Sequence, residues 1–559
     1  MAVRADRIKE VISRNTGFAF GRQFLTGLVF LFVTPYAISK LGVERYGVWA
    51  LTSAMLGYAA LGDLGVRTAF KKYVAQHHAV GRRDYILKLA GDGLVFYSVL
   101  GMLPALLALA FRRPILSAFN VGGDLLPEAE SLLLLMTVVF LIENLTNVFC
   151  GVVEGVQRME VSNSIFVGQS VLLGLGTVVA LAAGGGLVDM GVAAVTASAA
   201  AACSMFIAAQ RVTGLRLFPW RLRLSWAVFR EQVAYGMKLQ GSGIAMMGNL
   251  HLDKLLLARF WGLELVAIYE IALRMALVFR QVPALMVSAL VPAVSDLNAR
   301  GERALLEKIY ERGVRYVAAA GIPLAVVALI YSGDLITAWI GSPEFARASG
   351  VLRLLAVAHC TAILIDAPFA TARGLGILRY ELTTGLVHPL AHLTLGLLLV
   401  PALGLWGAGL AHASVVVTVA AGAAYWTHRG LRLSREPFVR FYGRMMRGPV
   451  LAAAIAAAGA LPVHLLLAGA LGISTGVFGS AAPGAGVAAG RLASIVTLCI
   501  SGTVFASIYL TAVLRIGVVS VKDMAGVPVL GRVLSSGLGR RVAGEERVGF
   551  RAGTGEVGS

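Results

Sequence analysis

Asp253 and Lys254 stand side by side in NLHLDKLLLARFWG, an otherwise apolar stretch that ends at Gly262. Glu270 follows the glycine by eight residues, and Arg274 lies four residues further along the same helical face. If the chain turns at Gly262, Lys254 and Glu270 lie at the same depth in two antiparallel helices. A charged residue at the centre of a bilayer costs about 2.5–3.5 kcal/mol, so such residues pair or bind something. We therefore predict a neutral group of these four charges, either a static clamp between helices or a gating network that breaks and reforms.

Three more cations lie inside apolar segments: Arg22, Lys238 and Arg280, with no acidic residue at an obvious pairing position. Arginine forks and lysine ammonium groups bind phosphate well where the dielectric constant is low. We predict that they bind a phosphorylated substrate, with Arg274 and Lys254 as further substrate contacts. Arg22 and Lys238 lie near a helix end, where snorkelling to the headgroups is an equal alternative. Arg280 lies deeper and is the strongest candidate.

Other charged residues favour structural explanations. Asp63 precedes Arg67 by four residues, which predicts a local ion pair. Asp92 and Glu143 have the chemistry of a site for H⁺ or Na⁺, but hydrogen bonding between helices is the preferred interpretation.

Two further pairs of residues are close in sequence. His388 and His392 have the i, i+4 spacing of metal ligands, but no third ligand is evident, so we predict packed neutral histidines and no metal site. Arg353 and Asp366 are too far apart on one helix to pair, and we assign them no role.

The composition indicates that the helices carrying these charges lie in a membrane. Of 559 residues, 58% are hydrophobic and 14% charged, with a mean hydropathy of +0.78. Apolar runs of about 20 residues, enough to span a bilayer as helices, recur throughout. We predict an all-α polytopic protein with fourteen transmembrane helices, at residues 17–40, 46–66, 89–111, 130–153, 161–185, 187–210, 233–260, 264–292, 316–338, 351–372, 380–402, 404–427, 448–472 and 492–514.

The net charge of +19 reflects orientation in the bilayer rather than a surface for nucleic acid. With both termini in the cytoplasm, the inner segments hold 36 of the 49 Lys and Arg residues, as the positive-inside rule requires.

The chain contains an internal repeat. GVERYGVW, starting at Gly42, resembles GLELVAIY, which starts 220 residues later at Gly262, and AVGRRDYILK resembles ARGERALLEK at the same offset. Six helices separate the copies, which predicts two lobes related by an axis along the membrane normal. The expected divisions are an N-lobe at 1–211, an interfacial linker at 212–232, a C-lobe at 233–430, helices 13 and 14 within 431–516, and a cytoplasmic tail at 517–559.

The run LGVERYGVWALTSAMLGYAALGDLGVRTAFKKYVAQ, together with LDKLLLARFWGLELVAIYEIALRMALVF and SALVPAVSDL, resembles bacterial polysaccharide-biosynthesis flippases. These belong to the multidrug/oligosaccharidyl-lipid/polysaccharide exporter superfamily. The resemblance implies alternating access through a cationic central cavity. It further implies that an undecaprenyl-pyrophosphate-linked oligosaccharide moves from the cytoplasmic to the outer leaflet of the bacterial inner membrane, for cell-surface polysaccharide such as O-antigen or exopolysaccharide.

Alternative functions fit the residues less well. A cation/drug antiporter of the same superfamily needs acidic residues in its cavity, and a membrane enzyme that polymerises sugars needs a sizeable outer loop or domain. A scaffold of polysaccharide assembly would tolerate loss of the intramembrane cations. The phosphate-binding motif GxxxxGK[ST] is absent, so we expect no nucleotide cofactor and leave H⁺ or Na⁺ as the coupling ion. The expected partners are the lipid-linked oligosaccharide, membrane lipids and the polymerase or export machinery, with the protein itself a monomer.

Overall fold

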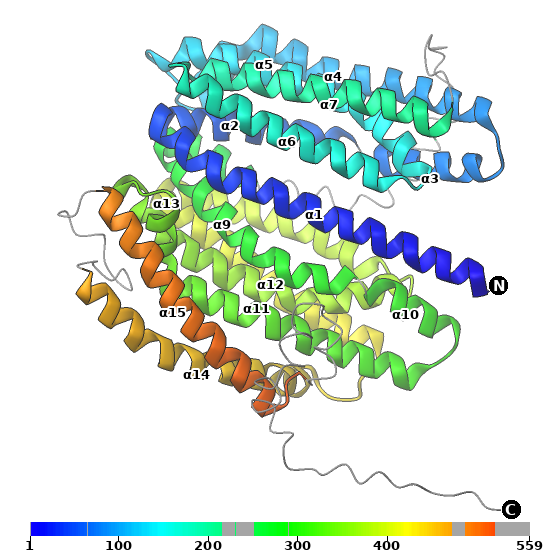
Figure 1. The fold of residues 1–559 in the computed structure, drawn as a ribbon, viewed down its shortest axis with the longest axis vertical. Helices are drawn as coiled ribbons and strands as arrows, with labels where there is room; N and C mark the ends of the chain where they lie inside the picture. The colour runs from blue at the N-terminus through cyan, green and yellow to red at the C-terminus, as the bar shows by residue number, and fades with distance from the viewer. Residues whose placement is uncertain are drawn as a thin grey trace, which may run out of the picture. The chain divides into compact units, whose positions relative to one another are not determined.

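The structure, a computed structural model, describes residues 2–63, 65–214, 230, 251–288, 290–471 and 487–519, and all regular structure in these ranges is helical (Figure 1). The first half contains α1 (Ala2–Leu41), α2 (Val43–Ala59), η1 (Ala60–Asp63), α3 (Val66–Ala79), α4 (Arg83–Ala118), α5 (Leu125–Gly155), α6 (Met159–Ala182) and α7 (Leu187–Thr213). After a helical stretch at 251–261 come α9 (Leu263–Ser288), α10 (Leu290–Ala299), α11 (Arg303–Trp339), η2 (Pro343–Arg347), α12 (Ala348–Gly374), α13 (Arg379–Leu431), α14 (Phe438–Ala470) and α15 (Val487–Ile516).

Ten helices in the described residues are long and apolar enough to cross a membrane. A helix satisfies its backbone hydrogen bonds within itself, which makes it one of the few structures that can lie in hydrocarbon. Many large apolar side chains on these helices are exposed, as lipid contact requires; Phe32, for example, is 73% exposed. The protein is therefore a polytopic, all-helical membrane protein.

Several helices extend beyond their predicted boundaries; α4, predicted at 89–111, runs from Arg83 to Ala118. The predicted helix at 46–66 is interrupted, because α2 ends at Ala59 and α3 begins at Val66 after Gly65 adopts a left-handed conformation (φ 77°). The predicted boundary between the helices at 380–402 and 404–427 is confirmed, because the backbone of α13 leaves the helical conformation at Gly404 (φ 56°, ψ −126°). Only residues 251–260 of the predicted helix at 233–260 lie within the described part of the chain.

The internal repeat recurs in the helix boundaries. The first residues of α2, α4 and α6 precede those of α9, α11 and α13 by the predicted offset of 220 residues. The junction glycines match as well: Gly42 (φ 80°) corresponds to Gly262 (φ 94°), and Gly81 (φ 71°) to Gly301 (φ 72°). Only glycine adopts this conformation without strain, so the repeated glycines set where each helix starts. The symmetry axis between the lobes stays a prediction.

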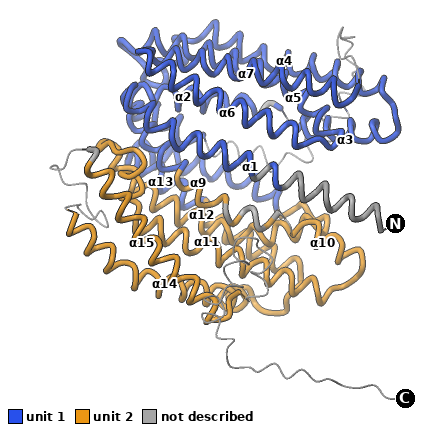
Figure 2. Tube along the Cα trace, viewed as in Figure 1, with its two compact units in different colours: residues 1–274, 381–415 blue, residues 275–380, 416–559 orange. Residues whose placement is uncertain are grey.

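The chain forms two compact units (Figure 2). Unit 1 comprises residues 1–274 and 381–415, and unit 2 comprises residues 275–380 and 416–559. In unit 1, α5 packs against α3, α4 and α7 around a core that includes Phe70, Tyr97 and Phe149. In unit 2, α11 packs against α12, α14 and α15, and a second core includes Tyr310 and Phe441.

Gly47 allows α2 to approach the start of α9 closely. A Cβ atom on Gly47 would lie 2.2 Å from the carbonyl oxygen of Leu263, a backbone atom that cannot rotate away. We expect Gly47→Ala to lower the free energy of unfolding by about 1–3 kcal/mol, the usual cost of overpacking, measured by thermal unfolding in detergent. Gly27→Ala is the matched control, because nothing lies within 4 Å of a Cβ atom there. Equal stability of the two variants would contradict the close contact.

Candidate functional site

The predicted ion pair between Lys254 and Glu270 is confirmed. Lys254 Nζ donates to Glu270 Oε2 over 2.9 Å, and each side chain is 4% exposed. Arg274 Nε donates to the other carboxylate oxygen of Glu270 from one turn further along α9. Gly262 explains the meeting, because each member of the pair lies eight residues from the turn where 251–261 gives way to α9. One carboxylate therefore holds two cations.

Arg274 differs from Lys254 in being accessible. Its side chain is 40% exposed, and its guanidinium carbon lies 4.1 Å from the centre of the Phe30 ring on α1. Stacking on an aromatic ring leaves the edge of the guanidinium available for a ligand. Arg274 therefore combines a buried acidic partner with a partly exposed side chain.

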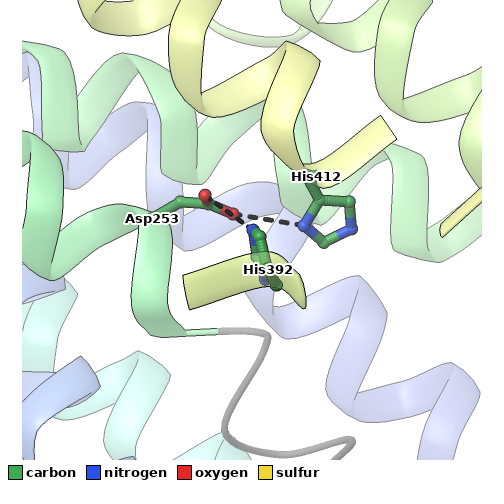
Figure 3. A group of neighbouring side chains, drawn as sticks. All are labelled: Asp253, His392 and His412. Atoms are coloured by element: carbon green, nitrogen blue, oxygen red, sulfur yellow. Dashed lines mark hydrogen bonds and ion pairs between the residues drawn. The ribbon is translucent and has the colours of Figure 1, made fainter. Parts of the chain in front are cut away.

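Asp253 does not join this group, contrary to the prediction. Its carboxylate lies between two imidazoles (Figure 3): His392 Nε2 is 3.0 Å from Oδ1, and His412 Nδ1 is 3.1 Å from Oδ2. Tyr269 also donates its hydroxyl to Oδ2. The prediction that no third metal ligand accompanies His388 and His392 is wrong for His392, which lies beside both Asp253 and His412. We name Asp253, His392 and His412 the carboxylate–imidazole cluster.

The potential metal-ligating atoms of this cluster all lie within 4.8 Å of one another. Within the described residues, no other set of three or more His, Cys, Asp or Glu side chains does so. All three side chains are buried. His412 was not among the predicted site residues, although His392 and His412 stand in two successive apolar segments, where buried histidines need polar partners.

The prediction that Arg280 has no acidic partner is wrong. Its Nη2 lies 3.5 Å from Oδ1 of Asp366, which is on α12 and had been assigned no role. The two side chains are 22% and 17% exposed. Arg353, the other residue without a role, donates to Ser332 Oγ over 2.7 Å. Arg280 is thus largely neutralised and is no longer the strongest candidate for a substrate contact.

Arg22 is the predicted cation that stays uncompensated. Its Nη1 lies 3.5 Å from Asn163 Oδ1, and its guanidinium carbon lies 4.5 Å from the centre of the Phe166 ring. Among the residues that the structure describes, no carboxylate forms an ion pair with it. Lys238, the third predicted cation, lies outside the described residues.

Two more cations belong to the surroundings of Arg22. Arg67 is close enough to Arg22 for their charges to interact, and Lys71 pairs with the same carboxylate as Arg67. Glu154 on α5 pairs with Lys71 Nζ at 3.3 Å and with Arg67 Nη2 at 3.9 Å. The predicted pairing of Arg67 with Asp63 is therefore wrong. Gly65 (φ 77°) breaks the helix between them, and the Asp63 side chain accepts from the Tyr97 hydroxyl instead. We name Arg22, Arg67, Lys71 and Glu154 the basic cluster; three cations and one anion leave a formal charge of +2.

Hydrogen bonding between helices explains Glu143, as predicted. Gln169 on α6 donates to Glu143 on α5 over 3.2 Å and to Ser198 on α7 over 3.1 Å. This chain of polar contacts joins three helices.

The chain resembles known proteins in sequence and in fold. The family model described as polysaccharide biosynthesis protein matches residues 41–343, more than half of the chain. A putative O-antigen transporter from Shigella flexneri is 20% identical over 381 residues, covering 66% of this chain and 86% of the relative. A probable flippase from Haloferax volcanii, AglR, is 21% identical over 415 residues, covering 72% of this chain and 80% of that protein.

Two solved structures share the fold. The lipid II flippase MurJ in an inward closed conformation has a TM-score of 0.65 at 11% identity, covering 87% of this chain and 98% of MurJ. An inward-facing multidrug resistance transporter of the MATE family has a TM-score of 0.62 at 16% identity, covering 74% of this chain and 98% of that chain. At these identities the likeness shows the fold alone. The match over residues 41–343 shows more: the chain belongs to the polysaccharide biosynthesis protein family.

Proposed function

We propose that this protein is a flippase that moves an oligosaccharide linked to undecaprenyl pyrophosphate from the cytoplasmic to the outer leaflet of a bacterial inner membrane. It acts as a transporter and not as an enzyme. The polysaccharide made from this cargo is destined for the cell surface. The curated names of relatives support the class of cargo, since one is a putative O-antigen transporter and another a probable flippase.

The observation that carries this proposal is the excess positive charge of the basic cluster. Arg67 and Lys71, which are 38% and 33% exposed, share a single carboxylate, Glu154, whose side chain is 16% exposed. Arg22 forms no ion pair with a described carboxylate and contacts Asn163 instead. Charge-assisted hydrogen bonds from arginine to phosphate are roughly twice as strong as neutral ones. A pyrophosphate would complete a cluster that is otherwise left positive.

The electrostatics of three carboxylates also favour this proposal over antiport of organic cations. Glu154, Glu270 and Asp366 each already face a cation, so none of these three offers an open negative charge to a cationic drug. We infer that the basic cluster captures the pyrophosphate while the lipid tail stays in the bilayer, and that alternating access then exposes the sugar on the other side.

Reconstitution tests the proposal. In liposomes containing the purified full chain and a lipid-pyrophosphoryl oligosaccharide, we expect an impermeant oxidant outside to reach the sugar initially located in the inner leaflet. Protein-free liposomes should protect that pool, and a glycolipid with the same sugar but no phosphate should stay protected even with the protein present. Exposure of both lipids alike would indicate a scramblase without phosphate recognition. No exposure of either lipid, or accumulation of an organic cation in its place, would contradict flipping.

A further inference from the structure

The carboxylate–imidazole cluster holds together segments that are distant in the chain. Asp253 belongs to the helical stretch 251–261, and both histidines belong to α13. His392 precedes the break at Gly404 and His412 follows it, so one carboxylate is bonded to both segments of the broken helix (Figure 3). Any change in the strength of these two contacts acts directly on the position of one segment relative to the other.

The charge balance around the cluster is close to zero. With both imidazoles neutral, Asp253 and Glu270 offset Lys254 and Arg274, and of these four groups only Arg274 is substantially exposed. One added proton would raise the sum to +1, and a divalent metal ion would raise it to +2. Buried charge is expensive in a membrane protein, so the balance favours a proton over a divalent ion.

The ligand chemistry favours a proton over Na⁺, the other common coupling ion. A hard cation such as Na⁺ prefers carboxylate, carbonyl and water oxygens, whereas the atoms that meet Asp253 here are imidazole nitrogens and a tyrosine hydroxyl. Imidazole is the side chain that takes up and releases a proton near neutral pH. The titratable or charged groups around the cluster are His251 and Lys254 on the helix of Asp253, Tyr46 and Tyr58 on α2, Tyr269, Glu270 and Arg274 on α9, and His388 on α13.

We propose that Asp253, His392 and His412 form a proton-binding site whose loading and unloading drives the transport cycle. The proton comes from water on one side of the membrane, adds to a nitrogen of one imidazole and leaves to water on the other side, with no other bond made or broken. A protonated imidazole binds the Asp253 carboxylate as an ion pair, more strongly than a neutral imidazole does. Loading therefore tightens one segment of α13 onto Asp253, and the break at Gly404 lets that segment move.

The coupling to cargo rests on the proposed flippase function, but proton binding is tested without cargo. Membranes containing the purified full chain are adsorbed to a sensor electrode, and the outside pH is jumped between about pH 5 and pH 8, where histidine titrates. We expect a transient charge displacement at each jump, with none when NaCl or ZnCl₂ is jumped at constant pH. If the flipping assay fails while the charge displacement is normal, the proposed cargo is contradicted and the proposed proton site is not.

Two variants test the residues. In His392→Gln the amide nitrogen replaces Nε2, and in His412→Asn it replaces Nδ1, so each variant keeps a donor to Asp253 but takes no proton. We expect each to reduce the displacement and the double variant to abolish it. The matched control is His464→Gln, because His464 is buried and lies 3.4 Å from Asp334, a similar contact outside the cluster; it should keep the displacement.

Four results would overturn the proposal. The first is a full displacement in the double variant, and the second is a displacement driven by Na⁺ or Zn²⁺ in place of the pH jump. The third is the absence of any displacement in the unmodified chain, which needs no variant to fold. Loss of the displacement in His464→Gln would move the proton site to Asp334 and likewise overturn the assignment.

Discussion

Replacing Glu270 with glutamine should lower the free energy of unfolding by about 3–5 kcal/mol, the usual cost of removing one partner from a buried ion pair. The substitution preserves the shape of the side chain but leaves Lys254, which is 4% exposed, without its carboxylate. It also removes the partner that orients Arg274 over Phe30. Equilibrium unfolding of the purified chain in mixed micelles, followed by tryptophan fluorescence, measures the effect.

Two further variants separate this effect from a general loss of charge. Adding Lys254→Gln to Glu270→Gln should recover part of the stability, because no uncompensated ammonium then stays buried. Glu128→Gln breaks the pair with Arg45, whose side chains are 33% and 42% exposed, so we expect a loss of no more than about 1 kcal/mol. Equal losses in Glu270→Gln and Glu128→Gln would show that the buried pair carries no special weight.

Arg22→Gln should weaken binding of a lipid pyrophosphate about 10- to 100-fold, since a hydrogen bond to a charged group contributes about 1.5–3 kcal/mol and each 1.4 kcal/mol is a factor of ten. Arg22 is stacked on Phe166 and has no acidic partner among the described residues, so its loss should affect the ligand more than the fold. Fluorescence titration of the purified chain with a labelled lipid pyrophosphate measures the affinity.

The comparison variants define what this result means. Arg22→Lys should retain intermediate affinity, because lysine keeps the charge but loses the planar fork. Arg113→Gln removes an arginine that is 73% exposed and paired with Glu130, and its affinity should match that of the unmodified chain. Unchanged affinity in Arg22→Gln would remove Arg22 from the binding site. A loss in Arg113→Gln equal to that in Arg22→Gln would point to nonspecific electrostatics.

The sequence by itself determined the class of protein and one detail of its interior. Composition and the length of the apolar runs predicted helices that cross a membrane, because in hydrocarbon the backbone must satisfy its own hydrogen bonds. The repeat at an offset of 220 residues predicted the matching helix starts. The pairing of Lys254 with Glu270 followed from counting eight residues on each side of Gly262. Residues at equal distances from a tight turn lie at the same depth in the two antiparallel helices.

Only the tertiary structure decided which partners meet across long separations. Arg280 finds Asp366 from 86 residues away, and Asp253 finds His392 and His412 from 139 and 159 residues away. In a soluble helix the apolar stripe shows which face is buried, but in a membrane the lipid-facing and protein-facing sides are both apolar. The rotation of each helix about its own axis is therefore hidden in the pattern of hydrophobicity, and packing against its neighbours sets which buried charges come together.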